Sequence, residues 1–334
     1  MKYLKYSDIA LVPQYSEVHS RIDCDTSVEF LNQKFKLPII PANMKSVINI
    51  DIAKWMSENS YFYIMHRFDR DIAEDIANAQ DWNVISFSVG VKSTDKMAIQ
   101  KISKRGHRVD YLTIDIAHGY CKRMRIMIEW IKKYLPNTKI IAGNVATPEA
   151  VIDLSAWGAD AVKVGIGQGS PCTTKDKTGF TMPMFSCVKK CSKTSFSKEN
   201  GFMISNASAS EDFDIPQKVP IIADGGIKHN GDIAKALVAG AKMTMAGGLF
   251  ASCIDSPASF ITINNVSCKA YFGSASAQNK GHSNNIEGKL TNITSNEMTY
   301  EEKLKEIKQD LQSSISYSGG NNLTSLYNTD YIEL

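Results

Sequence analysis

The sequence predicts an α/β fold, a (β/α)₈ TIM barrel closed by parallel strands. Short apolar runs alternate with helical segments, the runs are almost continuously hydrophobic, and the composition shows no break. Such runs are typical of parallel strands buried on both faces. A doubly wound open sheet has the same alternation and is the alternative fold. The eight expected strands are residues 38–40, 61–65, 84–89, 111–114, 139–142, 161–164, 219–223 and 242–245.

Length and composition favour one large domain, residues 1–334. The chain is 43% hydrophobic and 22% charged, with a net charge of +3. It has no basic block of the kind that binds a nucleic acid polymer. The N-terminal residues lack an apolar signal segment, and no apolar run reaches the roughly 18 residues needed to span a bilayer. We therefore expect a cytoplasmic protein without a membrane partner.

Helices are expected between the strands. Thr147 and Pro148 suit the cap and first turn of a helix that ends near Gly158, and residues 232–237 begin another that ends near Gly240. A capping box at residues 299–302 predicts a helix that directs Leu304, Ile307 and Leu311 inward.

Two polar segments read as additions to the barrel. Residues 193–217 are rich in Ser and Asn and predict a mobile insertion loop. Residues 274–296 follow the last expected strand and predict a mobile flap over the active face.

Polar or glycine-rich residues follow most of the expected strands. The carboxyl ends of barrel strands meet at one face, so these residues should converge on one active site. They are Asn43, Met44, His66, Arg67, Asp115, Gly143, Asn144, residues 165–172, residues 224–226, Gly247 and Gly248.

The loop at residues 165–175, GIGQGSPCTTK, is the strongest candidate. Its alternating glycines allow the backbone to approach a ligand closely, with N–H groups toward phosphate or carbonyls toward a monovalent cation. A tight turn with an incidental thiol at Cys172 is the alternative interpretation. The odd number of cysteines, seven, argues against a disulfide framework.

This loop resembles the catalytic loop Gly-x-Gly-x-Gly-Ser-x-Cys-x-Thr of the IMP dehydrogenase/GMP reductase family. The likeness extends over nearly the whole chain, and only residues 193–217 have no counterpart. The other similar motifs, in the order of the family, are residues 41–44 (PANM), 113–119 (TIDIAHG), 142–147 (AGNVAT), 223–227 (ADGGI), 271–274 (YFGS) and 310–317 (DLQSSISY).

The resemblance implies a covalent mechanism in purine nucleotide salvage. Cys172 would attack C2 of the purine and form a thioimidate intermediate. The family's dehydrogenases activate water with an adjacent Arg-Tyr pair on the flap, but this chain has no such pair and no arginine after Arg125. Its flap instead carries Glu287-Gly288-Lys289, which resembles the reductase element, and Thr174 completes the reductase pair. The resemblance thus implies NADPH-dependent reductive deamination of GMP to IMP and ammonia.

The resemblance also assigns binding residues. Asp224 would bind the ribose, Met44 would stack beside the purine, and Ser170 with several glycines would hold the phosphate. The full nucleotide set is Met44, Ser170, Asp224, Gly225, Gly226, Gly247, Gly248, Tyr271, Gly273, Ser274, Ala275 and Gly288. The cofactor set is Asp115, Ile116, Ala117, Asn144, Ile166, Gly167, Ser20, Arg21 and Arg67, with Ser20 and Arg21 meeting the cofactor's adenosine end from a neighbouring subunit. A potassium ion would be held at Gly167, Gly169, Cys172 and Lys175.

The family forms homotetramers, so we expect one here. Three other functions stay open from the sequence. One is an IMP dehydrogenase with an atypical flap, and another is a catalytically silent barrel that binds purine nucleotides. The third and weakest is a barrel oxidoreductase that carries flavin. Pro171 departs from the family, which usually has a small aliphatic residue there, and it removes one backbone N–H beside the nucleophile.

Overall fold

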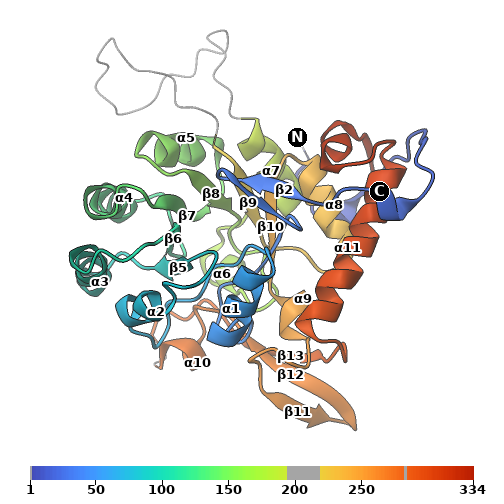
Figure 1. Cartoon of the computed structure of the whole chain (residues 1–334). Helices are drawn as coiled ribbons and strands as arrows, with labels where there is room; N and C mark the ends of the chain where they lie inside the picture. Colours follow the sequence, from blue (N-terminus) through green and yellow to red (C-terminus); the bar gives the residue numbers. More distant parts are fainter. Residues whose placement is uncertain (1, 194–218, 282–283) are drawn as a thin grey trace, which may run out of the picture.

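The computed structural model describes residues 2–193, 219–281 and 284–334. Its centre is a curled, seven-stranded parallel sheet in the order β4-β10-β9-β8-β7-β6-β5 (Figure 1). The strands are β4 (Ile39–Pro41), β5 (Ser86–Val89), β6 (Tyr111–Asp115), β7 (Lys139–Val145), β8 (Ala161–Val164), β9 (Ile221–Asp224) and β10 (Met243–Ala246).

The strand order identifies a barrel. Each strand from β5 to β10 lies beside the next one in the chain, and β10 then pairs with β4, the first of the seven. A doubly wound sheet would reverse its order at one point, so the open-sheet alternative is wrong. The chain has the (β/α)₈ fold.

The second expected strand, residues 61–65, is the one departure from the predicted eight. Here Met65 forms a single parallel bridge with Phe87, and residues 61–65 form no extended ladder. The side chain of Tyr63 gives a physical reason: its hydroxyl donates to the Val84 carbonyl at 2.7 Å and accepts from the Ser86 N–H at 3.3 Å. It thereby occupies backbone groups of the neighbouring strand. Residues 62–65 are nevertheless fully buried and fill the barrel position between β4 and β5.

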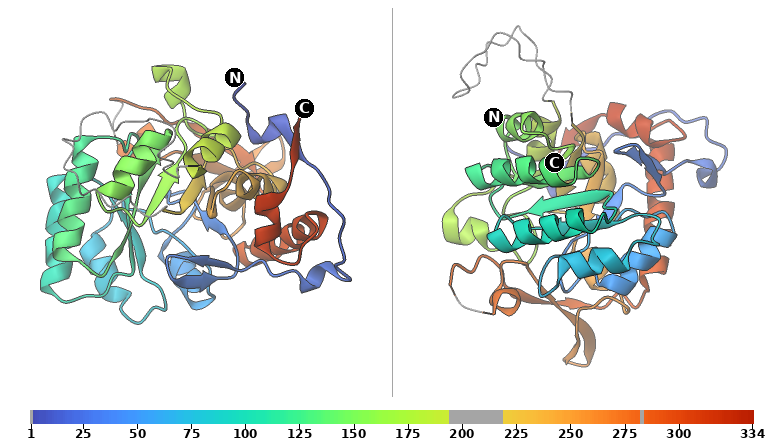
Figure 2. Two further views of the ribbon diagram at one scale, coloured as in Figure 1. Left: turned by 90° about the horizontal axis from the view of Figure 1, so that it is seen from above. Right: turned by 60° about the vertical axis from the view of Figure 1, so that its left-hand side comes forward.

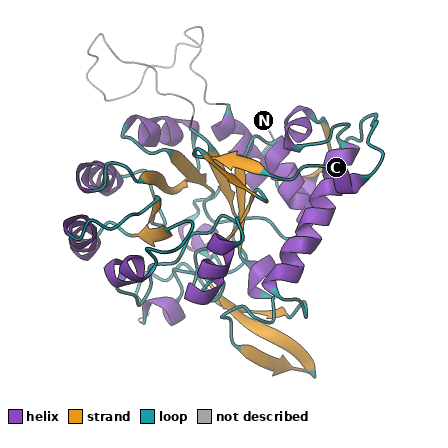
Figure 3. Cartoon of the chain, viewed as in Figure 1, coloured by secondary structure: helices purple, strands orange, loops and turns teal. Residues whose placement is uncertain are grey.

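Helices surround the strands (Figure 3). Those on the outside of the barrel are α1 (Ile50–Glu58), α2 (Ile72–Asn78), α3 (Ser93–Lys104), α4 (Lys122–Tyr134), α5 (Pro148–Ala156), α7 (Met184–Ser192), α8 (Asn230–Val238) and α11 (Tyr300–Tyr317). Shorter helices are α6 (Thr174–Thr178), α9 (Gly248–Ala251), α10 (Ala277–Lys280), and the 3₁₀ helices η1 (Tyr6–Asp8), η2 (Arg21–Asp23) and η4 (Leu323–Asn328). In the described part of the chain, no helix has the length and apolar character to cross a bilayer.

The predicted helix caps are confirmed. The Thr147 side chain accepts a hydrogen bond from the Ala150 N–H, and Pro148 occupies the first turn of α5. Thr299 and Glu302 form the capping box of α11, and the predicted inward residues Leu304, Ile307 and Leu311 are buried.

Three small sheets lie outside the barrel. Strands β1 (Ile9–Leu11) and β14 (Tyr331–Glu333) pair and bring the two ends of the chain side by side (Figure 2). Strands β2 (Val28–Phe30) and β3 (Gln33–Phe35) form a hairpin. The third sheet is β11 (Phe260–Ile263), β12 (Val266–Phe272) and β13 (Leu290–Thr294), which projects from the barrel in Figure 1.

The two predicted polar segments differ in outcome. The expected flap is not a loop throughout, because β13 lies within residues 274–296 and pairs with β12. Its alternating exposed and half-buried residues explain why it read as polar loop. The insertion expected at 193–217 lies outside the described residues except for Lys193, the C-cap of α7.

Candidate active site

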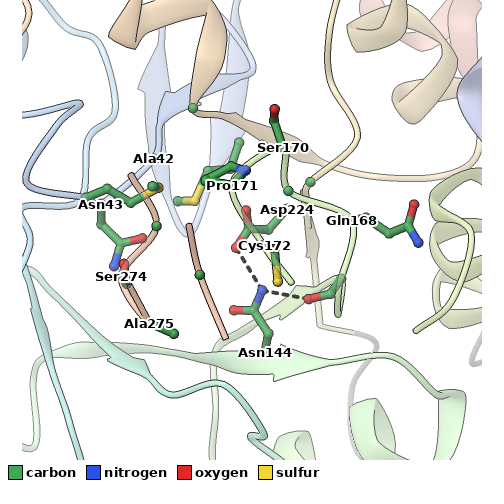
Figure 4. A pocket seen from close by; sticks show the side chains of 18 of the residues that line it. Ala42, Asn43, Asn144, Gln168, Ser170, Pro171, Cys172, Asp224, Ser274 and Ala275 are labelled. Carbon is green, nitrogen blue, oxygen red and sulfur yellow. Dashed lines mark hydrogen bonds between the residues drawn. The ribbon is translucent and has the colours of Figure 1, made fainter. Parts of the chain in front are cut away.

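A cavity of about 960 Å³ opens at the carboxyl ends of the barrel strands (Figure 4). Asp115 ends β6, Asn144 lies near the end of β7, and Asp224 ends β9. All three line the cavity, together with the loop that follows β8. The convergence predicted from residues that follow separate strands is therefore present.

The loop after β8 carries Cys172 and needs glycine at its start. Gly165 has φ +138°, and a Cβ there would lie 2.0 Å from the Asp224 carbonyl oxygen. Only glycine allows the loop to pass so close to β9. The loop closes on itself where the Cys172 N–H donates to the Gly169 carbonyl at 3.0 Å, which places the thiol inside the cavity (Figure 4).

A hydrogen-bonded chain links the thiol to a carboxylate. The Cys172 thiol donates a hydrogen bond to Thr174 Oγ1 at 3.2 Å, and the Thr174 hydroxyl donates to Glu287 Oε2 at 2.7 Å. Thr174 belongs to the first turn of α6, whereas Glu287 comes from the segment between α10 and β13. This arrangement can move a proton between a sulfur atom and a carboxylate through one hydroxyl group.

Backbone pairing fixes this geometry. Cys172 and Gly288 form an isolated antiparallel bridge. The Thr173 N–H donates to the Glu287 carbonyl, and the Lys289 N–H donates to the Pro171 carbonyl, both at 2.8 Å. Glu287 is thereby held against the cysteine loop by main-chain bonds rather than by its side chain alone.

A buried ion triad lies at the floor of the cavity. Lys163 in β8 is 2% exposed, and its Nζ lies 3.0 Å from Asp115 Oδ1 and 2.6 Å from Asp224 Oδ2. Burial acts to raise the pKa of the Asp115 carboxyl, but the Lys163 ammonium and the Arg67 guanidinium hold that pKa below its usual value. Burial acts to lower the pKa of Lys163, but the two carboxylates raise it above the usual value.

Lys163 is the main functional candidate that the sequence reasoning missed. The sequence pattern assigns Lys163 only to an apolar strand. The signal was present, because a lysine inside an otherwise apolar strand must find buried counter-charges.

Asn144 connects the triad to the cysteine loop. Its Nδ2 donates to Asp224 Oδ2 and to the Gly165 carbonyl, both at 2.8 Å (Figure 4). Its Oδ1 is buried without a hydrogen-bond partner among the described residues. A buried oxygen of this kind is an acceptor in need of a ligand donor, because unpaired buried polar atoms are costly.

Tyr271 shapes the wall beside the last strand. A Cβ at Gly247 would lie 2.0 Å from the Tyr271 hydroxyl oxygen, so glycine is needed where the two segments meet. Burial raises the pKa of Tyr271, so this hydroxyl is a neutral donor near pH 7.

Most sequence-predicted site residues line this one cavity. They are Met44, Arg67, Asp115, Ile116, Ala117, Asn144, Ile166, Gly167, Gly169, Ser170, Cys172, Thr174, Asp224, Gly225, Gly226, Gly247, Gly248, Tyr271, Gly273, Ser274, Ala275, Glu287 and Gly288.

Three residues assigned by the resemblance do not line it, and neither do His66 and Gly143 from the strand ends. Lys175 is exposed on α6, next to the cavity residue Thr174. Ser20 and Arg21 lie at η2, where the Arg21 guanidinium donates to the Tyr317 hydroxyl at 3.2 Å and covers its ring at 5.0 Å. Within this chain, Ser20 and Arg21 therefore lie apart from the predicted site residues that line the cavity.

No group of three or more His, Cys, Asp or Glu side chains within the described ranges could hold a metal ion. Among the cysteines of the described residues, only Cys121 and Cys172 are not buried. Of these two, Cys172 lines the cavity. The structure thus singles out the thiol that the sequence motif selected.

Comparison with known proteins gives a consistent result. The family model "IMP dehydrogenase / GMP reductase domain" matches residues 3–333. A GMP reductase of Staphylococcus carnosus is 44% identical over 336 residues, covering 99% of this chain and 96% of the relative. A GMP reductase of Leptothrix cholodnii is 43% identical, covering 100% and 97%. One of Oenococcus oeni is 44% identical, covering 99% and 97%.

Proposed function

Because this chain belongs to the IMP dehydrogenase/GMP reductase family, we propose that it is a GMP reductase, which converts GMP, NADPH and a proton to IMP, ammonia and NADP⁺. The observation that carries the proposal is the chain of contacts from Cys172 through Thr174 to Glu287. A nucleophile, a hydroxyl relay and a carboxylate are what the loss of an amino group from C2 requires.

The proposed reaction begins at the thiol. The Cys172 thiol gives its proton through the Thr174 hydroxyl to the Glu287 carboxylate, and the thiolate sulfur adds to C2 of GMP. The C2–N2 bond then breaks, and the proton returns from Glu287 through Thr174 to the departing nitrogen, so that ammonia leaves. A thioimidate between Cys172 and C2 remains. A hydride then bonds to C2, the C2–S bond breaks and IMP is released. The thiolate then takes up a proton from solvent, which restores the starting thiol.

NADPH supplies that hydride when it is bound. We propose that Asp115, Ile116, Ala117, Asn144, Ile166 and Gly167 hold its nicotinamide end, with Arg67 near its charged groups. The unpartnered Asn144 Oδ1 supports this fit, because a carboxamide NH₂ is the kind of donor that it lacks.

The nucleotide is proposed to bind on the opposite wall. Asp224 Oδ2 already accepts from Lys163 and Asn144, which leaves Oδ1 for the ribose hydroxyls. Ser170 and the glycines at 225–226 and 247–248 line the same cavity and would hold the phosphate through backbone N–H groups. Met44, Tyr271, Gly273, Ser274, Ala275 and Gly288 complete the proposed pocket for the base.

The decisive experiment follows NADPH oxidation by near-ultraviolet absorbance with GMP, and measures ammonia in the same sample. Equal amounts of NADP⁺ and ammonia are expected from the wild type and none from C172A. C121A is the matched control, because Cys121 is also half-buried but lies outside the cavity. Reduction of NAD⁺ with IMP in place of this reaction would identify a dehydrogenase. Nucleotide binding without turnover would identify a silent binding barrel.

We also propose a cytoplasmic homotetramer that uses potassium at the loop of Gly167, Gly169 and Cys172. Light scattering coupled to size exclusion tests the assembly. Replacing potassium with a large organic cation tests the ion, and activity independent of the cation would remove it from the proposal.

A further inference from the structure

We propose that Lys163 is a positioning residue that holds the Asp115 and Asp224 carboxylates together as one ion triad, and so fixes the cofactor wall and the nucleotide wall of the cavity relative to each other. The proposal deepens the proposed function and rests on it for the roles of the two aspartates. The triad itself stands on the structure alone.

The geometry places one cation between two strands on opposite sides of β8. Asp115 ends β6, two strands away, and Asp224 ends the adjacent strand β9. The Lys163 Nζ reaches both, and its side chain is 2% exposed. Two of its three N–H donors are therefore directed at carboxylates that belong to different walls.

Charge balance makes Lys163 necessary for this arrangement. The two bound carboxylate oxygens are at most about 5.6 Å apart, the sum of their distances to Nζ. Two carboxylates this close favour protonation of one of them unless a cation compensates. The Arg67 guanidinium acts on Asp115, while Tyr271 and Tyr6, both buried, are the neutral titratable groups near Asp224. Among these neighbours, Lys163 is the cation that bonds to both carboxylates.

The triad also decides which carboxylate oxygens remain available. Lys163 and Asn144 both donate to Oδ2 of Asp224. The other oxygen of Asp224, Oδ1, therefore remains available to accept a hydrogen bond from a ligand.

The chain offers a control for the general effect of removing a buried lysine. Lys269 in β12 is 1% exposed, but its Nζ donates to the carbonyls of Ile254 and Ser256 and lies over the Phe260 ring. It contacts no carboxylate at salt-bridge distance among the described residues and does not line the cavity.

The experiment compares K163M, K163R and K269M with the wild type. Calorimetry measures IMP and NADP⁺ binding separately, and turnover is measured across pH. In K163M we expect both ligands to bind roughly tenfold or more weakly, because each aspartate loses a charged partner. The acidic limb of kcat/KM should move to higher pH, because one carboxylate now takes up a proton more readily. K269M should lower the unfolding temperature without either change.

K163R separates charge from position. It keeps the cation, so the acidic limb should stay in place, while its longer planar group should raise the KM for GMP and NADPH. If K163M does not fold, an unchanged KM in K163R overturns the proposal. If K163M folds, unchanged binding and an unchanged acidic limb overturn it. A wild type that binds IMP but does not turn over GMP would defeat the proposed function, and the binding arms would still test Lys163.

Discussion

Cys172 and Gly288 are 116 positions apart in sequence, yet they face each other as partners in an antiparallel β-bridge. The two backbone bonds that flank the bridge run from Thr173 to Glu287 and from Lys289 to Pro171. The bridge therefore fixes the position of the Glu287 side chain relative to the cysteine loop.

Replacing Glu287 with glutamine should remove the proton acceptor at the end of the chain from Cys172. We expect kcat for GMP reduction to fall on the order of a hundredfold or more, because general acid–base groups contribute about that much. The KM for GMP should change little. E297Q, which alters a nearby glutamate outside the cavity, is the control. Full activity in E287Q would exclude Glu287 from proton transfer.

Replacing Thr174 with valine should break the same chain at its centre, since the hydroxyl bonds to both Cys172 and Glu287. Ammonia release in a single turnover should slow by about tenfold to a hundredfold. T174S keeps the hydroxyl and should restore most of the rate. T178V changes another threonine of α6 and should behave as wild type, whereas equal losses in T174V and T178V would point to damage to the helix.

Replacing Gly288 with alanine should distort the flap itself at the point where it pairs with the cysteine loop. An added Cβ would lie 2.8 Å from the Ser276 backbone nitrogen, which cannot move without the chain. We expect lower kcat and faster proteolysis within residues 274–296, measured by limited digestion. G231A in α8 adds its methyl group to open space and should keep activity while raising stability by about 0.5–1 kcal/mol. Unaltered proteolysis in G288A would contradict this role for the bridge.

His66 should make the fold sensitive to acid. Burial, with Arg70 and Lys45 nearby, lowers its pKa to about 4 from an ordinary value of 6.5. The unfolded chain therefore binds a proton at a pH where the folded chain does not. This stabilisation is present above pH 6.5 and is lost as the pH falls toward 4. We expect the free energy of unfolding to drop by about 2 kcal/mol between pH 7 and pH 5 from this residue.

Urea unfolding at both pH values measures that drop, with H66N as the comparison. Asparagine can still accept the Phe68 N–H bond made by His66 Nδ1 but does not titrate. A pH dependence equal in H66N and the wild type would show that His66 is not its source.

The sequence predicted the barrel because apolar runs and the residues at their ends follow simple periodicity and position. That residues 61–65 form no ladder could not be predicted, since the competing bonds of the Tyr63 hydroxyl to Val84 and Ser86 are set by tertiary packing. Strand β13 was missed because its alternating polar residues resemble a loop until β12 provides a partner.

In the site, the motif placed Cys172, Thr174 and Glu287, and the structure brings them into contact. Their catalytic roles remain predictions. The partners of Lys163 were beyond sequence reasoning, because they come from strands whose neighbours are known only once the barrel closes. Ser20 and Arg21 do not line the cavity of this chain, so their predicted contact with the cofactor would need the neighbouring subunit of the proposed tetramer.

The bridge between Cys172 and Gly288 also joins two parts of the proposed active site that belong to different segments of the chain. The thiol and the ion triad belong to the barrel, while the carboxylate is delivered by a segment that must part from the loop if the cavity is to open more widely. With that segment lifted, the thiol would lose both its cover and the far end of its proton chain. A small alkylating reagent should therefore modify the half-buried Cys172 faster when that segment is lifted than when it is in place.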